Sequence, residues 1–188
     1  MSMKLSKPQT LEEFLAWEGR QELRYEFDGW HTVAMTGGTV NHAVITDNAA
    51  DALRRRLKPP CRAFTSNLKV LAAGSVRYPD VVVTCSPVDG SSDTLPNPVV
   101  VFEVLSPSTA AVDRLVKNEE YRNTPSIQRY IMLEQGRIGA TIFARIGDAW
   151  IGTVMLGNAT LEMPEIDVAV PLAEFYLNVD LPPPDIDD

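Results

Sequence analysis

Two nearly unbroken apolar runs in the middle of the chain constrain its fold more than any other feature. Residues 81–84 read Val-Val-Val-Thr, and residues 99–105 read Val-Val-Val-Phe-Glu-Val-Leu. β-Branched side chains favour strands, and a strand that is apolar along its whole length is buried on both faces. The two runs therefore predict central strands of a sheet that other elements cover on each side.

Each run carries one carboxylate where an apolar residue is expected: Asp80 opens the first, and Glu103 interrupts the second. Burying a carboxylate is costly unless it is paired or bound to a metal. If the strands are neighbours, both groups converge near one end of the sheet, where oxygen ligands suit Mg²⁺ and the ion could assist phosphodiester hydrolysis. The alternative is that Asp80 caps its strand and Glu103 pairs with an Arg.

The surrounding pattern predicts an α/β fold, a sheet with helices on its faces and a C-terminal strand meander. A capping box at Thr10 and Glu13 begins the first helix, and Asp28-Gly29 marks a hairpin. The predicted helices are 11–19, 40–57, 113–123 and 172–176, and the predicted strands are 23–27, 30–34, 62–71, 79–84, 99–105, 127–133, 141–143 and 150–155.

Length and charge predict one domain, residues 1–179, followed by an acidic Pro/Asp tail at 180–188. The net charge is -8, from 17 basic and 25 acidic residues, which counts against nucleic-acid binding. Residues 54–77 nevertheless contain seven basic residues and no acid. This segment is either a contact surface for phosphates or a solvated helix end and strand rim.

The two cysteines, Cys61 and Cys85, lie in strand-like runs without a metal-binding spacing. They are interpreted as small buried thiols in a reducing compartment, which predicts a cytoplasmic protein. No apolar run approaches the roughly 20 residues that span a bilayer, so no membrane association is expected.

The motif Pro79-Asp80, followed by Glu103 on the next apolar strand, resembles the PD-(D/E)XK signature of the restriction-endonuclease-like superfamily. More closely, the chain is similar to the Uma-type family of endonucleases. The similar segments are 12–15, 25–29, Met35 with His42, 78–83, 103–109, and Asp113 with Lys117 and Tyr121. The resemblance implies a central mixed β-sheet flanked by helices and a site that binds Mg²⁺ or Mn²⁺ through Asp80 and Glu103.

One departure from the signature concerns its lysine, because the position two residues after Glu103 is Leu105. The resemblance implies a migrated lysine, and Lys117 is the first candidate because Asp113, Lys117 and Tyr121 share a helix face. Lys69 on the preceding strand is the second. The alternative is that Asp113 and Lys117 form a surface ion pair of little energetic consequence.

Two further residues are candidates for the site. Glu26 is a possible third carboxylate ligand of the metal, although the alternation of its hairpin strand is equally consistent with a solvated position. His42 begins the long predicted helix, where it either binds a phosphate or packs in the core.

The leading hypothesis is therefore a Mg²⁺-dependent endonuclease that hydrolyses DNA phosphodiester bonds. The alternative is a noncatalytic module that keeps the nuclease fold and binds nucleic acid or protein, which the acidic balance and the missing lysine favour. A homodimer is expected for the enzyme, because cutting both strands of a duplex is simplest with two symmetric sites.

Overall fold

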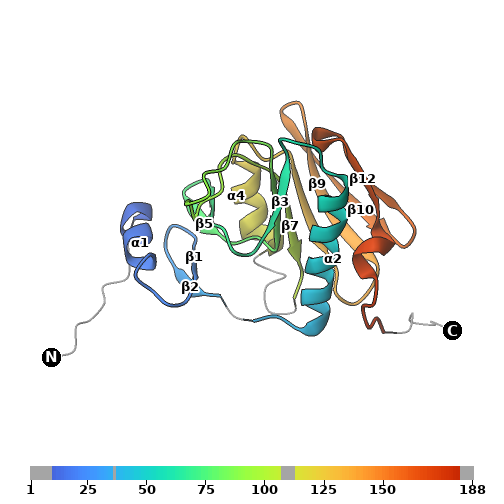
Figure 1. The fold of residues 1–188 in the computed structure, drawn as a ribbon, viewed down its shortest axis with the longest axis horizontal. Coiled ribbons are helices and arrows are strands. Elements are labelled where there is room, and N and C mark those ends of the chain that lie inside the picture. The colour runs from blue at the N-terminus through green and yellow to red at the C-terminus, as the bar shows by residue number, and fades with distance from the viewer. Residues whose placement is uncertain (1–9, 36, 107–112, 183–188) are drawn as a thin grey trace.

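The sheet predicted from the two apolar runs is the centre of the molecule (Figure 1). In this computed structural model, which describes residues 10–35, 37–106 and 113–182, six strands lie in the order β10-β9-β8-β7-β6-β3. The apolar runs form β6 (Val81–Thr84) and β7 (Pro98–Val104), whose residues are all buried except the half-buried Val99. The prediction of two central strands is confirmed.

The central sheet is mixed, as the fold class requires. Strand β7 runs parallel to β8 (Arg129–Leu133), and every other neighbouring pair is antiparallel. The outer strands are β3 (Arg62–Thr65), β9 (Gly139–Ile146) and β10 (Ala149–Leu156). A parallel pair needs a crossover, and the helical segment between β7 and β8 supplies it.

Helix α2 (Val40–Arg56) covers one face of this sheet (Figure 1). The Thr39 hydroxyl accepts a hydrogen bond from the backbone of His42 and caps the helix at its first turn. Its apolar stripe, which includes Ile45 and Leu53, is fully buried against the sheet. The same core is completed by β11 (Thr160–Met163), η2 (Pro164–Ile166), β12 (Val168–Pro171) and η3 (Leu172–Tyr176).

The opposite face is covered by the helix that follows β7. It starts with the π-helical η1 (Asp113–Lys117) and continues as α4 (Asn118–Arg122), so the single helix predicted over 113–123 has two geometries. Tyr121 is fully buried here and meets the ring of Tyr130 edge to face, with centroids 4.9 Å apart. This contact seats the helix on the sheet close to the end of β7.

A second, four-stranded sheet lies beside the first, in the order β2-β1-β5-β4 (Figure 1). The predicted hairpin forms its edge, and the Asp28 carboxylate accepts hydrogen bonds from the backbone amides of Trp30 and His31. Helix α1 packs on this sheet through Phe14, which stacks on Phe27. The elements are α1 (Leu11–Glu18), β1 (Tyr25–Phe27), β2 (Thr32–Ala34), β4 (Val70–Ala72) and β5 (Ser75–Arg77).

The predicted strand pattern differs from the structure in three places. The strand expected over 62–71 breaks at a turn near Asn67, and its halves β3 and β4 belong to different sheets. The short strand β5 was not predicted, because three residues after the Gly74 turn carry too little pattern to be recognised. Strands β11 and β12 were missed for the same reason, since each has only four residues.

The interpretation of the cysteines as free thiols is also wrong. Cys61 and Cys85 form a disulfide, and both are half-buried. The register of β3 and β6 explains the pairing, because Arg62 lies opposite Thr84 and the cysteines occupy the next opposed positions. The prediction of a cytoplasmic location rested on free thiols, and the disulfide removes that support. Within the described ranges, no helix has the length and apolar character needed to cross a membrane.

Candidate active site

The two predicted carboxylates lie on the same side of the sheet at the end of two neighbouring strands. Strands β6 and β7 are antiparallel with Val81 opposite Phe102, so Asp80 and Glu103 occupy the next opposed positions. Opposed residues of antiparallel strands point to the same face, with their Cβ atoms about 5 Å apart. The backbone amide of Val104 donates to Oδ2 of Asp80 at 2.7 Å, which fixes the aspartate beside β7.

Glu103 is buried and receives two hydrogen bonds from the helix that follows it. Nζ of Lys117 and the hydroxyl of Tyr121 both lie 3.0 Å from Oε1 of Glu103. Burial, together with the neighbouring Glu103 charge, raises the pKa of the Tyr121 hydroxyl well above its usual value. Tyr121 therefore remains a neutral donor, and Lys117 supplies the positive charge that allows Glu103 to be buried as a carboxylate.

Glu26 joins this group of charges from the four-stranded sheet. Its Oε1 lies 3.4 Å from Nζ of Lys117 and accepts the backbone amide of Tyr78 at 3.2 Å. Its Oε2 lies 3.1 Å from Nη1 of Arg77. The alternative of a solvated Glu26 is thus wrong, because only 15% of its side chain is exposed.

Arg77 and Glu120 belong to the same cluster of charged residues, and the sequence analysis gave neither of them a role at the site. The guanidinium makes two parallel hydrogen bonds to the Glu120 carboxylate, at 2.7 and 2.6 Å, and both residues are buried. The hydroxyl of Ser75 donates to Glu120 as well, at 2.8 Å. Helical spacing could have indicated Glu120, because it lies three residues after Lys117 on a neighbouring part of the helix surface.

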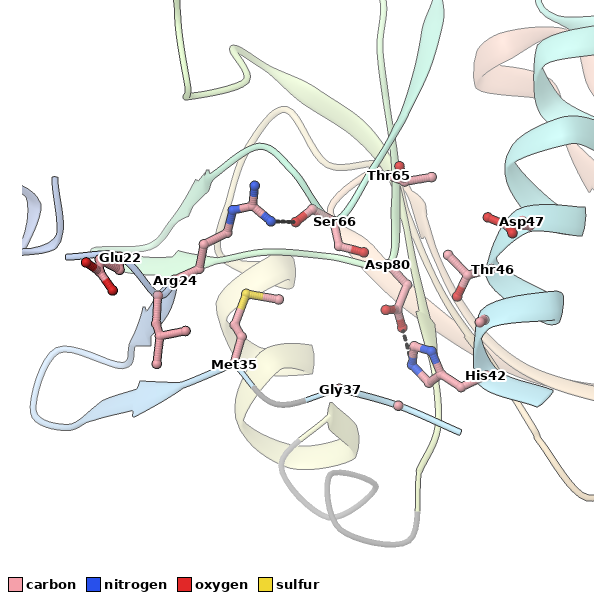
Figure 2. Close-up of a pocket in the computed structure, with 13 residues that line it drawn as sticks. Glu22, Arg24, Met35, Gly37, His42, Thr46, Asp47, Thr65, Ser66 and Asp80 are labelled. Carbon is pink, nitrogen blue, oxygen red and sulfur yellow. Dashed lines mark hydrogen bonds and ion pairs between the residues drawn. The ribbon is translucent and has the colours of Figure 1, made fainter. Parts of the chain in front are cut away.

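His42 lies at the opening of the site. Its Nε2 is 3.2 Å from Oδ2 of Asp80, and both side chains face the same cleft (Figure 2). The cleft has a volume of about 640 Å³ and lies between the hairpin side of the molecule and the first turns of α2. Its lining includes Asp80 and His42, together with Glu22, Arg24, Met35, Thr46, Asp47, Thr65 and Ser66.

Arg24 stands on the wall of this cleft opposite His42 (Figure 2). Its Nη1 donates to the backbone carbonyl of Ser66 at 3.5 Å, and its guanidinium lies 5.9 Å from the centre of the Tyr78 ring. Across the parts of the chain that the structure describes, no carboxylate forms an ion pair with it. Arg24 is an exposed residue of the cleft lining, so its guanidinium is accessible to an anion that enters the cleft.

Lys69 and Asp113 are the two remaining candidates from the sequence. Lys69 is buried away from the carboxylate pair, where its Nζ lies 2.9 Å from Glu18 and 2.6 Å from Asp93. Of the two lysines, Lys117 is therefore the one beside Glu103, as the sequence predicted. The side chain of Asp113 lies outside the described part of the structure.

The basic segment 54–77 is largely neutralised by acids from other parts of the chain. Arg56 pairs with Glu174, Lys58 pairs with Asp167 at 2.8 Å, and Arg54 lies near Asp51 at the end of α2. The other ion pairs from this segment are those of Arg55 with Asp51 and Glu174, Lys69 with Glu18 and Asp93, and Arg77 with Glu26 and Glu120. The interpretation as a solvated helix end and strand rim is favoured over a phosphate surface.

Asp80 and Glu103 are the side chains at the sheet end that could hold a hard divalent cation. Asp80 and Glu103 offer two carboxylates on one face, and no group of three or more metal-binding side chains exists within the described residues. Mg²⁺ is commonly held by one or two carboxylates and keeps several waters. Counted over the described side chains, the buried group has three carboxylates (Glu26, Glu103 and Glu120) and two cations (Lys117 and Arg77), and Asp80 adds another negative charge.

A mixed sheet flanked by helices, with opposed acidic side chains at one end and a lysine beside them, defines a protein of the restriction-endonuclease-like fold. A solved structure from Anabaena variabilis, described as a putative nuclease belonging to DUF820, shares this fold with a TM-score of 0.73. It is 17% identical in sequence and is matched over 90% of this chain and 98% of its own.

The chain belongs to the Uma2 family, described as putative restriction endonuclease, which it matches over residues 11–175. Two uncharacterized proteins of Synechocystis sp. are similar over most of their length. The protein slr1290 is 32% identical over 170 residues, which cover 88% of this chain and 90% of the relative. The protein sll1609 is 29% identical over 170 residues, which cover 86% and 96%.

Proposed function

We propose that this protein is an endonuclease that hydrolyses DNA phosphodiester bonds with a Mg²⁺ or Mn²⁺ ion held by Asp80 and Glu103. The observation that carries the proposal is the opposed placement of these two carboxylates beside the buried ammonium of Lys117. Membership of a family of nuclease-like proteins supports the same reaction class. When bound, such an ion supplies Lewis-acid stabilisation of the phosphate and lowers the pKa of a bound water.

Asp80 and Glu103 are held in place by hydrogen bonds from neighbouring groups. Asp80 accepts the amide of Val104, and Glu103 accepts Tyr121 and Lys117. These hydrogen bonds fix the orientation of each carboxylate before substrate arrives. The side chains thus need little rearrangement when a cation binds.

Lys117 supplies a compact positive charge beside the scissile phosphate. A pentavalent phosphorus transition state carries more negative charge on its oxygens than the ground state, and a preorganised ammonium stabilises that excess. Arg24 and His42 lie on opposite walls of the cleft and suit phosphate contacts on either side of Asp80. In this proposal they bind the backbone of the nucleic acid, and Lys117 acts at the reacting group.

The second candidate function is a noncatalytic module that binds nucleic acid or protein. The net charge of -8 opposes binding of a polyanion and therefore favours a protein partner. The loss of catalysis is supported by Leu105, which stands where the superfamily signature has lysine. The two candidates differ in the need for a metal. The nuclease requires a divalent ion at Asp80, whereas a binding module does not.

The deciding experiment is a cleavage assay on the purified full chain with Mn²⁺ and, separately, with Mg²⁺. Supercoiled plasmid, linear duplex, single-stranded DNA and single-stranded RNA are each incubated with the wild type and with Asp80→Ala. The proposal expects cleavage of DNA that is lost with EDTA and with Asp80→Ala. Persistent cleavage by the variant would assign the activity to a contaminant, and stable DNA binding without cleavage would support the binding module.

The plasmid substrate also tests the expected homodimer. Two symmetric sites cut both strands in one encounter and give linear plasmid early, whereas one site gives nicked circles first.

A further inference from the structure

We propose that Glu26 is a positioning residue that holds the ammonium of Lys117 at the site, and that the Arg77–Glu120 ion pair braces it. In this account Glu26 is not a ligand of the metal. The inference rests on the proposed function, because Lys117 is the group that Glu26 serves. Its test includes measurements that do not depend on cleavage.

The contacts of Glu26 leave little capacity for a metal. One carboxylate oxygen accepts the amide of Tyr78 and contacts the ammonium of Lys117, and the other accepts the guanidinium of Arg77. Two cations on one buried carboxylate satisfy its charge. A divalent ion approaching the same oxygens would be repelled by both of them.

The register of the small sheet explains how Glu26 reaches the site. Strands β1 and β5 are antiparallel with Phe27 opposite Val76, so Glu26 and Arg77 are the next opposed residues. Opposed residues face the same side, and here that side is toward the helix that carries Lys117. Glu26 and Arg77 therefore form one unit attached to the small sheet.

Glu120 connects this unit to the helix of Lys117. It lies three residues after Lys117 and makes two parallel hydrogen bonds to Arg77, with a third hydrogen bond from Ser75. Paired hydrogen bonds between a guanidinium and a carboxylate restrict both distance and angle. The Arg77–Glu120 ion pair thus fixes the helix against the small sheet. Glu26 then fixes the end of the Lys117 side chain.

Lys117 needs such support because it does not come from a strand. A lysine side chain has four rotatable bonds, and ordering it costs conformational entropy. The strand position two residues after Glu103 is Leu105, which is buried in the apolar core instead. The ammonium arrives from a neighbouring helix and is held between Glu103 at 3.0 Å and Glu26 at 3.4 Å.

The first test compares Glu26→Gln with Glu18→Gln. Glu18 is a matched control, since it is a buried carboxylate bonded to a buried lysine, Lys69, away from the carboxylate pair. Glu26→Gln should lower the single-turnover cleavage rate by about 100-fold, the cost of misplacing a reacting group by about 1 Å. Glu18→Gln should keep the wild-type rate per folded molecule, with folding checked by circular dichroism.

Two further variants identify how Glu26 acts. Glu26→Asp, which keeps the charge, should restore part of the rate. In a Lys117→Met background, Glu26→Gln should add no further loss, because residues that act through one another are not additive. Independent losses that multiply in the double variant would overturn the proposal.

Metal binding separates a positioning residue from a ligand, and it needs no activity. Isothermal titration of Mn²⁺ should give Glu26→Gln the wild-type affinity within about twofold. A loss of about tenfold or more, the scale reported for disturbed metal sites, would make Glu26 a ligand and overturn the inference.

Labelling of lysines with an acetylating reagent, read by mass spectrometry, tests the geometry directly. Lys117 should be labelled faster in Glu26→Gln than in the wild type, measured against the exposed Lys58 as internal standard. Equal labelling would overturn the positioning role. If the wild type proved inactive, the proposed function would fail, and the titration and labelling would still decide whether Glu26 positions Lys117.

Discussion

The ammonium of Lys117 lies 3.0 Å from Oε1 of Glu103, although the two residues are 14 positions apart in the chain. The link between them is the crossover helix, which returns from the end of β7 and packs against the face that carries Glu103. A helix thus supplies the cation beside Glu103. The strand position that holds lysine in the superfamily signature is therefore occupied by the apolar Leu105.

A divalent ion should stabilise the folded protein, because it binds the native carboxylate pair and has no such site in the unfolded chain. At about 100 times its dissociation constant, the ion adds about 2.7 kcal/mol to the free energy of unfolding, which is a rise in melting temperature of roughly 5–10 °C. Asp80→Asn should remove this rise, measured by calorimetry with Mn²⁺. Asp167→Asn, an exposed acid bonded to Lys58, is the control and should keep it. An undiminished rise in Asp80→Asn would place the ion elsewhere.

Arg24 should contribute to DNA affinity, and the arginines at the end of α2 should not. The segment 54–56 lies about 18 Å along the helix from His42 and is paired with acids. Arg24→Gln should reduce the slope of log affinity against log salt by about 0.9, one phosphate contact on duplex DNA. Substituting all of residues 54–56 with Ser should leave that slope unchanged in fluorescence anisotropy. The opposite pattern would move the phosphate surface to the end of α2.

Tyr176 should make the protein less stable at alkaline pH. Burial raises the pKa of its hydroxyl to about 12, and the hydroxyl donates to the backbone carbonyl of Gly139 at 2.7 Å. A pKa raised by folding contributes stability that is present below the unfolded value of about 10 and is lost as pH rises toward 12. Between pH 9 and 11 this group should cost about 1 kcal/mol of unfolding free energy, measured in urea. Tyr176→Phe should lose correspondingly less over that range, and an identical loss would contradict the assignment.

Much of the fold could be predicted because its strongest signals are long or chemically specific. The apolar runs at 81–84 and 99–105 gave the central strands, and Asp28-Gly29 gave the hairpin. The short strands β5, β11 and β12 could not be found, because three or four residues carry no reliable period. Their place is set by the neighbours with which they pair.

The site was partly predictable because some of its residues carry a chemically specific signal in the sequence. A carboxylate inside an apolar strand is costly, so Asp80 and Glu103 stood out, and helical spacing selected Lys117 and Tyr121. Contacts between distant segments carried no signal, as with the pairing of Glu120 to Arg77 or of the basic segment to scattered acids. Charge read along the chain therefore misrepresented charge in space.

The most direct test of the central claim compares two lysines that are equally buried. Among the described residues, Lys69 pairs with Glu18 and Asp93. Lys117 pairs with Glu26 and lies beside Glu103. Single-turnover cleavage of a DNA duplex with Mn²⁺ is measured for Lys117→Met and Lys69→Met, normalised to the folded fraction of each. A loss of about 100-fold or more in Lys117→Met, the scale of removing a key electrostatic group, with Lys69→Met at the wild-type rate, is the predicted result. Equal rates for the two variants would contradict a nuclease site built on Asp80, Glu103 and Lys117.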